Sequence, residues 1–226
     1  MSSILEGLNE AQKEAVLYFD SPLLVLAGAG SGKTRVITHK IMFLTQEFGI
    51  DIDRILAITF TNKAASEMKE RVKNALGLEK EPNWITTFHS LSAKILRIEA
   101  QRLGYNRDFA IYDEEDSKKL LKDIVEEANL DKDLYKPERL KNIISQIKQN
   151  LDESLLDFYE MQLPHIRTIY EKYQEGLIFA NAMDFDDLLL NVVKLFKENE
   201  EIRQKWQDMF DYILVDEYQD TNKIQH

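Results

Sequence analysis

One stretch decides the fold of this chain, and it reads Leu23-Leu24-Val25-Leu26-Ala27-Gly28-Ala29-Gly30-Ser31-Gly32-Lys33-Thr34. The first four residues are apolar and follow Ser21-Pro22, which predicts a short strand. The glycines let backbone N–H groups curl around phosphate oxygens, and a helix from Lys33 to about Phe48 would turn its N-terminus toward the same anion. Lys33 would neutralise the β- and γ-phosphates, and the Thr34 hydroxyl would bind Mg²⁺.

The match to the phosphate-loop pattern G-x4-G-K-[ST] is one letter short, because Ala27 stands where the pattern has glycine. The alternative is a glycine-rich turn with a chance Lys-Thr. The flanking strand and helix signals favour the phosphate loop.

Strand and helix signals alternate on both sides of this loop. Apolar runs at Arg54–Phe60 and Trp84–Phe88 precede helical spacing at Ala64–Leu76 and Leu91–Leu103, which predicts a parallel sheet with helices on its faces.

Strand signals then vanish, and amphipathic helices are expected at Glu114–Ala128, Pro137–Gln149 and Pro164–Gln174. Their expected core is Leu120, Leu121, Ile124, Val125, Ile143, Ile144 and Ile147. The α/β pattern resumes with helices Phe185–Phe196 and Ile202–Phe210 and a strand at Tyr212–Val215. We therefore expect an α/β domain over 1–106 and 181–226, interrupted by an all-helical insertion over 107–180.

The strand predicted at Tyr212–Val215 ends in two acids. Its four apolar residues favour a strand buried on both faces, with carboxylates emerging at the edge where open α/β sheets bind ligands. Asp216 would hold Mg²⁺, and Glu217 would be the general base that orients the attacking water. The alternative is a strand that ends in a solvated acidic turn.

Composition excludes several classes of protein. The 226 residues contain no cysteine, so disulfides, thiolate metal sites and a cysteine nucleophile are excluded. The net charge is −11: residues 1–106 carry 13 Lys and Arg against 12 Asp and Glu, whereas residues 107–226 carry 16 against 28. General nucleic-acid binding is disfavoured, so any such contact is expected in the first half. The chain has no apolar run of 18 residues and no secretory leader, which predicts a cytoplasmic protein without membrane contact.

Several ordered motifs resemble the superfamily 1 DNA helicases of the UvrD/PcrA/Rep type. Besides the phosphate loop, they are Leu8-Asn9-x-x-Gln12, Thr59–Met68, Thr87–Ser90, Asp184–Leu189 and Asp216-Glu217-Tyr218-Gln219-Asp220-Thr221-Asn222. They span residues 8–222. The resemblance implies a RecA-like P-loop NTPase domain 1A, interrupted by a helical subdomain 1B.

The resemblance also implies site residues. Those near ATP are Gln12, which would read the adenine edge, Ala27, Gly28, Ala29, Gly30, Ser31, Gly32, Lys33, Thr34, Arg35 and Arg71. Those at single-stranded DNA are Phe60, which would stack on a base, Thr61, Asn62, His89 and Ser90. Each has a structural alternative: a capping box for Asn9 and Gln12, core for Phe60, helix caps for Thr61, Asn62 and Ser90, a structural or surface place for His89, and surface ion pairs for the two arginines. Asp184–Asp187 is expected to be a charge cluster at a helix N-terminus, with no chemistry.

The implied activity is ATP-driven 3′–5′ translocation on single-stranded DNA and duplex unwinding, with ATP and Mg²⁺ as cofactors. The implied partners are single-stranded DNA, single-strand/duplex junctions, the C-terminal domains of the same protein and DNA-repair proteins. The family's later motifs are absent from residues 1–226, so these residues alone are expected to be nearly inactive. Two alternatives stay open: the helicase part of an AddA/RecB-like helicase–nuclease, and a nucleotide-binding interaction module without turnover. A small-molecule kinase fits poorly, because it would leave the 59–68 and 87–90 motifs without a purpose.

Overall fold

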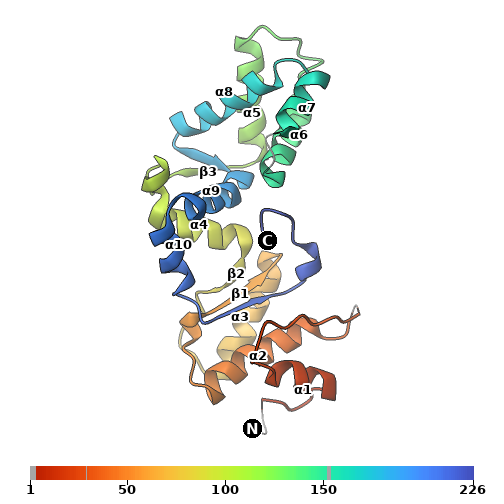
Figure 1. Ribbon diagram of the computed structural model, residues 1–226, viewed down its shortest axis with the longest axis vertical. Helices are drawn as coiled ribbons and strands as arrows, with labels where there is room; N and C mark the ends of the chain where they lie inside the picture. Colours follow the sequence, from red (N-terminus) through yellow and green to blue (C-terminus); the bar gives the residue numbers. More distant parts are fainter. Residues whose placement is uncertain (1–3, 29, 152–153) are drawn as a thin grey trace. The chain divides into compact units, whose positions relative to one another are not determined.

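The computed structural model describes residues 4–28, 30–151 and 154–226 (Figure 1). Its chain divides into two compact units. The first comprises Met1–Leu91 with Gln204–Asp220, and the second comprises Ser92–Arg203 with Thr221–His226. The predicted boundaries at 106/107 and 180/181 differ from these. The chain passes between the units inside two helices, α4 (Phe88–Glu99) and α10 (Glu200–Gln207), and a third time between Asp220 and Thr221. The assignment of subdomains 1A and 1B remains a prediction.

The first unit is built on a parallel three-stranded sheet with the order β2-β1-β5 (Figure 1). The strands are β1 (Ile55–Thr59), β2 (Ile85–Thr87) and β5 (Tyr212–Val215), as predicted from their apolar runs. Ile55 of β1 pairs with Tyr212 of β5, and Thr59 pairs with Thr87 of β2. All three carboxyl ends therefore meet at one edge of the sheet.

Helices α2 (Lys33–Glu47) and α3 (Asn62–Leu76) pack on this sheet. Helix α2 agrees with the prediction to within one residue, and α3 begins two residues before the predicted Ala64. Ile41 and Leu44 of α2 and Met68 of α3 are buried against Ile55 and Ile85. Helix α1 (Glu10–Leu17) packs on α2, and short 3₁₀ turns lie at Ile52–Arg54 and Tyr218–Asp220. A buried apolar core thus joins the helix that begins at the phosphate loop to the sheet.

The predicted strand at residues 23–26 is wrong. The segment forms no strand, no described strand pairs with it, and Leu24 and Leu26 are 64% and 86% exposed. A strand needs a neighbouring backbone edge about 4.8 Å away. Instead, a cavity of about 830 Å³ is lined on one side by this segment and on another by β5.

The expectation that β5 is buried on both faces is also wrong. Among the described residues β5 pairs only with β1, so it lies at an edge of the sheet. Ile213 is 61% exposed, and the other residues of β5 are half-buried. The apolar composition of the run predicted the strand correctly but could not fix how many neighbours it has.

The second unit is mainly helical, and its core was largely predicted. Besides parts of α4 and α10, its helical elements are a 3₁₀ turn (Ala100–Leu103), α5 (Glu114–Glu127), α6 (Pro137–Asn150), α7 (Ser154–Gln162), α8 (Ile166–Phe179) and α9 (Phe185–Glu198). The predicted core residues pack together, with Leu120 partly buried and the other six buried. Helix α8 begins at Ile166, after His165 in a left-handed conformation (φ 69°), and not at Pro164.

The expectation of an all-helical insertion is wrong in one respect. Strands β3 (Ala110–Tyr112) and β4 (Ala182–Asp184) form a parallel two-stranded sheet in the second unit. Each strand has three residues, too few for an alternating pattern to stand out in the sequence. Helix α7 was not predicted either. No helix among the described residues is long and apolar enough to cross a bilayer.

A buried ion-pair cluster lies in this unit, where the sequence suggested only an N-terminal charge cluster. Asp184 does cap α9, in a reciprocal capping box with Asp187. The Lys148 ammonium also lies 2.9 Å from Asp184 and 2.7 Å from Asp187, all three side chains being buried. Lys141 bridges Asp184 and Asp186, and the Tyr173 hydroxyl donates to Asp184. Burial by itself would raise the pKa of Asp184, but the two ammonium groups hold it well below its usual range.

We expect Lys148→Met to destabilise the chain by about 3–5 kcal/mol, because two buried carboxylates would lose their main counter-charge. Urea unfolding followed by circular dichroism measures this loss. The matched control is Lys118→Met, which removes a partly buried lysine that also pairs with two carboxylates, those of the exposed Glu114 and Glu115. If the two variants unfolded at the same urea concentration, the buried cluster would have no special role in stability.

Candidate active site

The phosphate loop passes directly into α2. Gly30 and Gly32 have φ values of 73° and 84°, a region that favours glycine, and Gly32 is the N-cap of α2. No side chain caps this helix, so the N–H groups of its first turn remain available for an anion. Ala29, one of the predicted phosphate contacts, lies outside the described residues.

Lys33 lies over the loop and near the acidic strand end. Its ammonium donates to the carbonyl oxygens of Ala27 and Gly28, each at 3.3 Å, and lies 4.0 Å from a carboxylate oxygen of Glu217. The side chain is 24% exposed. A phosphate group entering the loop would offer this cation a stronger acceptor than either carbonyl.

Thr34 and Asp216 meet, although 182 positions separate them in the chain. The Thr34 hydroxyl donates to the Asp216 carboxylate at 2.9 Å, and Asp216 is 5% exposed. Two oxygens on adjacent positions of an octahedral Mg²⁺ also lie about 2.9 Å apart, because Mg²⁺–O distances are about 2.0–2.1 Å. The two side chains therefore fit a Mg²⁺ ion. The described residues contain no group of three or more acidic or histidine side chains that could hold a metal alone, so phosphate and water would complete the shell.

Glu217 occupies a strained backbone position. Its φ is 51°, in the left-handed region, and such strain clusters at functional sites. The Gln219 side-chain amide donates to the Glu217 carboxylate, and the Glu217 N–H donates to Asp216 at 3.1 Å. The sequence predicted no role for Gln219, which lies in the Asp216–Asn222 motif. Its side chain contacts the predicted base in the structure.

Gln12 lies against the phosphate loop. Its carbonyl oxygen accepts from the Asn9 N–H at 3.0 Å and Asn9 accepts from the Gln12 N–H, so the predicted capping box is present. Its amide nitrogen donates to the Ser31 carbonyl at 2.9 Å. The same side chain thus serves the helix cap and touches the loop.

The two candidate arginines are exposed. Arg35 lies beside Gly7, where an added Cβ would come within 2.6 Å of its guanidinium. Arg71 pairs at 3.8 Å with Glu67 on the exposed surface of α3, as the structural alternative foresaw. Their contacts with a nucleotide remain predictions.

The candidate DNA residues follow the same sheet edge. Phe60 comes directly after β1, is half-buried, and packs edge-on against Phe88 with ring centroids 5.8 Å apart. Thr61 caps α3 by accepting from the Ala64 N–H, and Asn62 begins that helix and accepts from Thr87 at 3.4 Å. These contacts confirm the helix-cap reading for Thr61.

His89 and Ser90 lie in the first turn of α4. Ser90 is not the N-cap, because α4 begins at Phe88. The Thr87 hydroxyl instead accepts from the Ser90 N–H at 3.3 Å and donates to the Ser90 hydroxyl at 3.0 Å. The sequence predicted no role for Thr87, which begins the Thr87–Ser90 motif. Its hydroxyl holds the first turn of α4 through both hydrogen bonds with Ser90.

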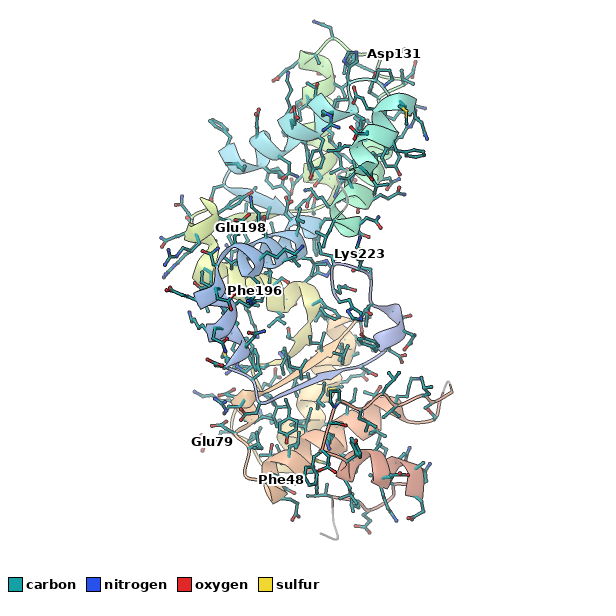
Figure 2. All side chains as sticks on the ribbon, viewed as in Figure 1. Phe48, Glu79, Asp131, Phe196, Glu198 and Lys223 are labelled. Carbon is teal, nitrogen blue, oxygen red and sulfur yellow. The ribbon has the colours of Figure 1, made fainter. Side chains whose placement is uncertain are left out.

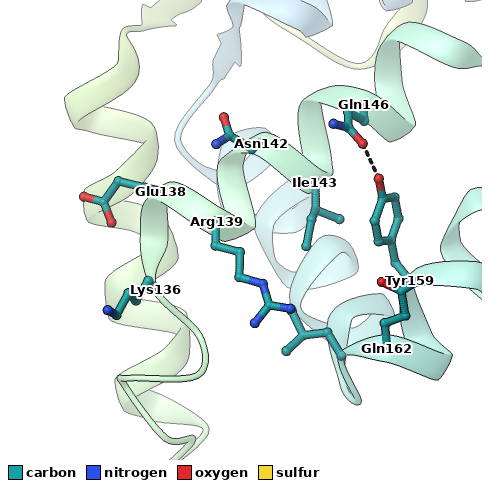
Figure 3. Close-up of a pocket in the computed structure, with 9 residues that line it drawn as sticks. Lys136, Glu138, Arg139, Asn142, Ile143, Gln146, Tyr159 and Gln162 are labelled. Carbon is teal, nitrogen blue, oxygen red and sulfur yellow. Dashed lines mark hydrogen bonds between the residues drawn. The ribbon is translucent and has the colours of Figure 1, made fainter.

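Two cavities differ in what lines them. The one of about 830 Å³ includes Lys33, Asp216 and Glu217 in its lining, beside apolar residues of the 22–26 segment. The other, of about 520 Å³, lies on α6 and α7 and contains no predicted site residue (Figure 3). There the Tyr159 hydroxyl donates to Gln146. The predicted catalytic groups therefore line the larger cavity.

Comparison with known proteins identifies the family. The family described as "UvrD/REP helicase N-terminal domain" matches residues 8–226. The chain is 42% identical over 232 residues to "ATP-dependent DNA helicase PcrA" of Staphylococcus aureus, and 42% identical over 229 residues to the protein of that name in Staphylococcus epidermidis. All of the chain is covered, but it spans only 31% of the length of each relative.

The family match and the full coverage at this identity agree with the juxtaposed phosphate loop and acidic strand end. The chain belongs to the UvrD/REP helicase family, as its N-terminal domain.

Proposed function

We propose that this chain is the ATP- and single-stranded-DNA-binding N-terminal part of an ATP-dependent DNA helicase. The whole protein would couple ATP hydrolysis to 3′–5′ translocation and duplex unwinding in the cytoplasm. Its partners would be single-stranded DNA, single-strand/duplex junctions, its own C-terminal domains and DNA-repair proteins. The observation that carries the proposal is the 2.9 Å contact between Thr34 of the phosphate loop and Asp216 after β5. The names of the relatives support the same activity.

Binding of ATP is assigned to the loop and its neighbours. Gly28 to Gly32 and the first turn of α2 would surround the phosphates, and Lys33 would leave the carbonyls of Ala27 and Gly28 for the β- and γ-phosphates. Gln12 would turn part of its amide toward the adenine edge, with Arg35 and Arg71 nearby. Thr34 and Asp216 would hold Mg²⁺, which supplies positive charge against the developing negative charge on the phosphates.

Hydrolysis is assigned to Glu217. Its carboxylate, oriented by Gln219, would orient the attacking water and accept its proton. The residues 1–226 alone are expected to turn over ATP very slowly. An arginine finger is worth about 10³–10⁵ in rate, and in this proposal it comes from another part of the protein.

Binding of single-stranded DNA is assigned to the residues that follow β1 and β2. Phe60 would stack on a base, while Thr61, Asn62, His89 and Ser90 would contact the backbone. The Asp216 N–H donates to the Ile58 carbonyl of β1 at 2.8 Å. DNA contacts and nucleotide contacts would therefore share one sheet edge. A shift of β5 along β1 would change the geometry of both sets of contacts.

We expect Lys33→Ala to lower ATP affinity at least about tenfold, because a charge-assisted contact worth about 1.5–3 kcal/mol is lost. Isothermal titration of the chain with ATP measures this change. The control is Lys172→Ala, an exposed lysine of α8 in the other unit. Unchanged affinity in the Lys33 variant would remove the phosphate role.

We expect Glu217→Gln in the full-length protein to keep ATP binding but to lower the hydrolysis rate about 10²–10⁴-fold, because the amide cannot accept the proton of the attacking water. Single-turnover hydrolysis with labelled ATP separates the two effects. If the variant hydrolyses ATP at the wild-type rate, Glu217 is not the base. If it also retains the biological role, a non-hydrolysing interaction module is the better assignment.

We expect Phe60→Ala to weaken single-stranded DNA binding about 5- to 150-fold, because stacking on one base is worth about 1–3 kcal/mol. Fluorescence anisotropy with a labelled oligonucleotide measures binding, and ATP affinity should be unchanged. Phe179→Ala is the matched control, since Phe179 is an aromatic residue that is 95% exposed in the other unit. Equal DNA affinity of the Phe60 variant and wild type would rule out stacking.

A further inference from the structure

Lys40 is a buried lysine of α2 that the proposed function does not use. It is 8% exposed and lies two turns after the phosphate-loop residues Lys33 and Thr34. Its ammonium donates to the backbone carbonyls of Val16, at 2.8 Å, and of Tyr18. It also lies 5.6 Å from the centre of the Phe43 ring. The groups that these contacts place around the cation are thus uncharged.

The two carbonyls belong to the C-terminal end of α1. This helix has eight residues, carries no basic residue in its last turn and ends at Tyr18 as C-cap. The last carbonyls of a helix have no partner within the helix and carry its negative dipole end, so a cation supplied from elsewhere stabilises them. Lys40 supplies that cation, reaching across from α2.

Burial lowers the pKa of Lys40, because desolvation disfavours the charged form. Keeping an ammonium in this place is therefore costly for the chain, and the contacts it makes must offset the cost. Its hydrogen bonds join the end of α1 to α2, although the side chain also lines the cavity of about 830 Å³.

The other end of α1 carries Gln12. The capping box holds Gln12 at the helix start, and its amide nitrogen donates to Ser31 of the phosphate loop. An added Cβ at Gly32 would lie 2.9 Å from the same nitrogen, so there is little room between α1 and the loop. A small tilt of α1 would therefore displace Gln12 from the loop.

Aromatic packing supports the same end of the helix. Phe48, labelled in Figure 2, follows α2 and packs edge-on against Phe19, with ring centroids 4.9 Å apart, and against Phe43 at 5.3 Å. These ring contacts pack Phe19, the residue after Tyr18, against the end of α2. Lys40 provides the polar part of this junction.

We propose that Lys40 is a positioning residue for recognition of the nucleotide base: by capping the C-terminus of α1 it holds Gln12 against the phosphate loop. The inference rests on the proposed function, because it assigns Gln12 to adenine. Lys40 itself touches neither base nor phosphate in this proposal. Its effect should therefore appear in base-dependent affinity and not in triphosphate affinity.

The experiment compares binding of ATP, GTP and inorganic triphosphate to the chain by isothermal titration. We expect Lys40→Met to weaken ATP binding about two- to tenfold, the value of one misplaced hydrogen bond, and to leave triphosphate affinity unchanged. The preference for ATP over GTP should fall by the same factor. Lys40→Arg keeps donors and charge and should retain the preference. Lys172→Met is the control.

A double variant tests whether Lys40 acts through Gln12. Gln12→Ala combined with Lys40→Met should bind ATP no more weakly than Gln12→Ala alone. Full additivity, an equal loss of ATP and triphosphate affinity in Lys40→Met, or a lost preference in Lys40→Arg would each overturn the proposal. If Lys40→Met does not fold, Lys40→Gln, which removes the charge, takes its place in the same titrations, and an unchanged base preference in that variant would overturn the proposal.

The same titrations separate this inference from the proposed function. Wild type that bound neither ATP nor triphosphate would refute the proposed function. Wild type that bound ATP with its base preference, together with an unaffected Lys40→Met variant, would refute only the role of Lys40.

Discussion

The contact between Thr34 and Asp216 is the one on which the rest of this site depends. It joins the start of α2 to the end of β5 across 182 positions of sequence. Neither residue could hold its place alone. Asp216 is fixed because β5 pairs with β1 and the Asp216 N–H continues that ladder to Ile58. Thr34 is fixed because Ile41 and Leu44, further along α2, are buried against the same sheet. Burial of apolar surface on the sheet thus sets a distance between two polar groups.

The carboxylate of Asp216 also orients the residue that follows it. One oxygen accepts from Thr34 and the other from the Glu217 N–H, so rotation of the side chain would break both contacts. Glu217 then adopts a left-handed backbone conformation, a position that costs about 1–3 kcal/mol for a residue other than glycine. The strain directs its side chain to within 4.0 Å of Lys33. The candidate base and the candidate phosphate-binding cation are therefore placed by one short turn.

The sequence predicted what local pattern and short motifs determine. Helices α2 and α3, strands β1, β2 and β5, and the Asn9–Gln12 capping box follow from residues within a few positions of each other. It failed where a distant partner decides the outcome. Residues 23–26 are as apolar as β5, yet among the described residues only β5 pairs with a neighbouring strand. Asp184 was expected to serve a helix N-terminus, but its burial depends on Lys148, 36 positions earlier. In the site, the motif predicted Glu217 as the base, whereas its contact with Gln219 depends on the left-handed turn that the structure shows at Glu217.

The open edge of β5 bears on how the site responds to a ligand. Parallel strands are ordinarily covered on both faces. Among the described residues, β5 pairs only with β1. The cavity beside it is lined by Leu24, Leu26 and Ile213, all of which are exposed. An element with one hydrogen-bonded neighbour and little buried surface opens at lower free energy than the strands beside it. Asp216 and Glu217 extend from this element, whereas Lys33 and Thr34 extend from the well-packed α2. A ligand that contacted both sides would act mainly by ordering the weaker side, so we expect the acidic strand end to change more on ligand binding than the start of α2.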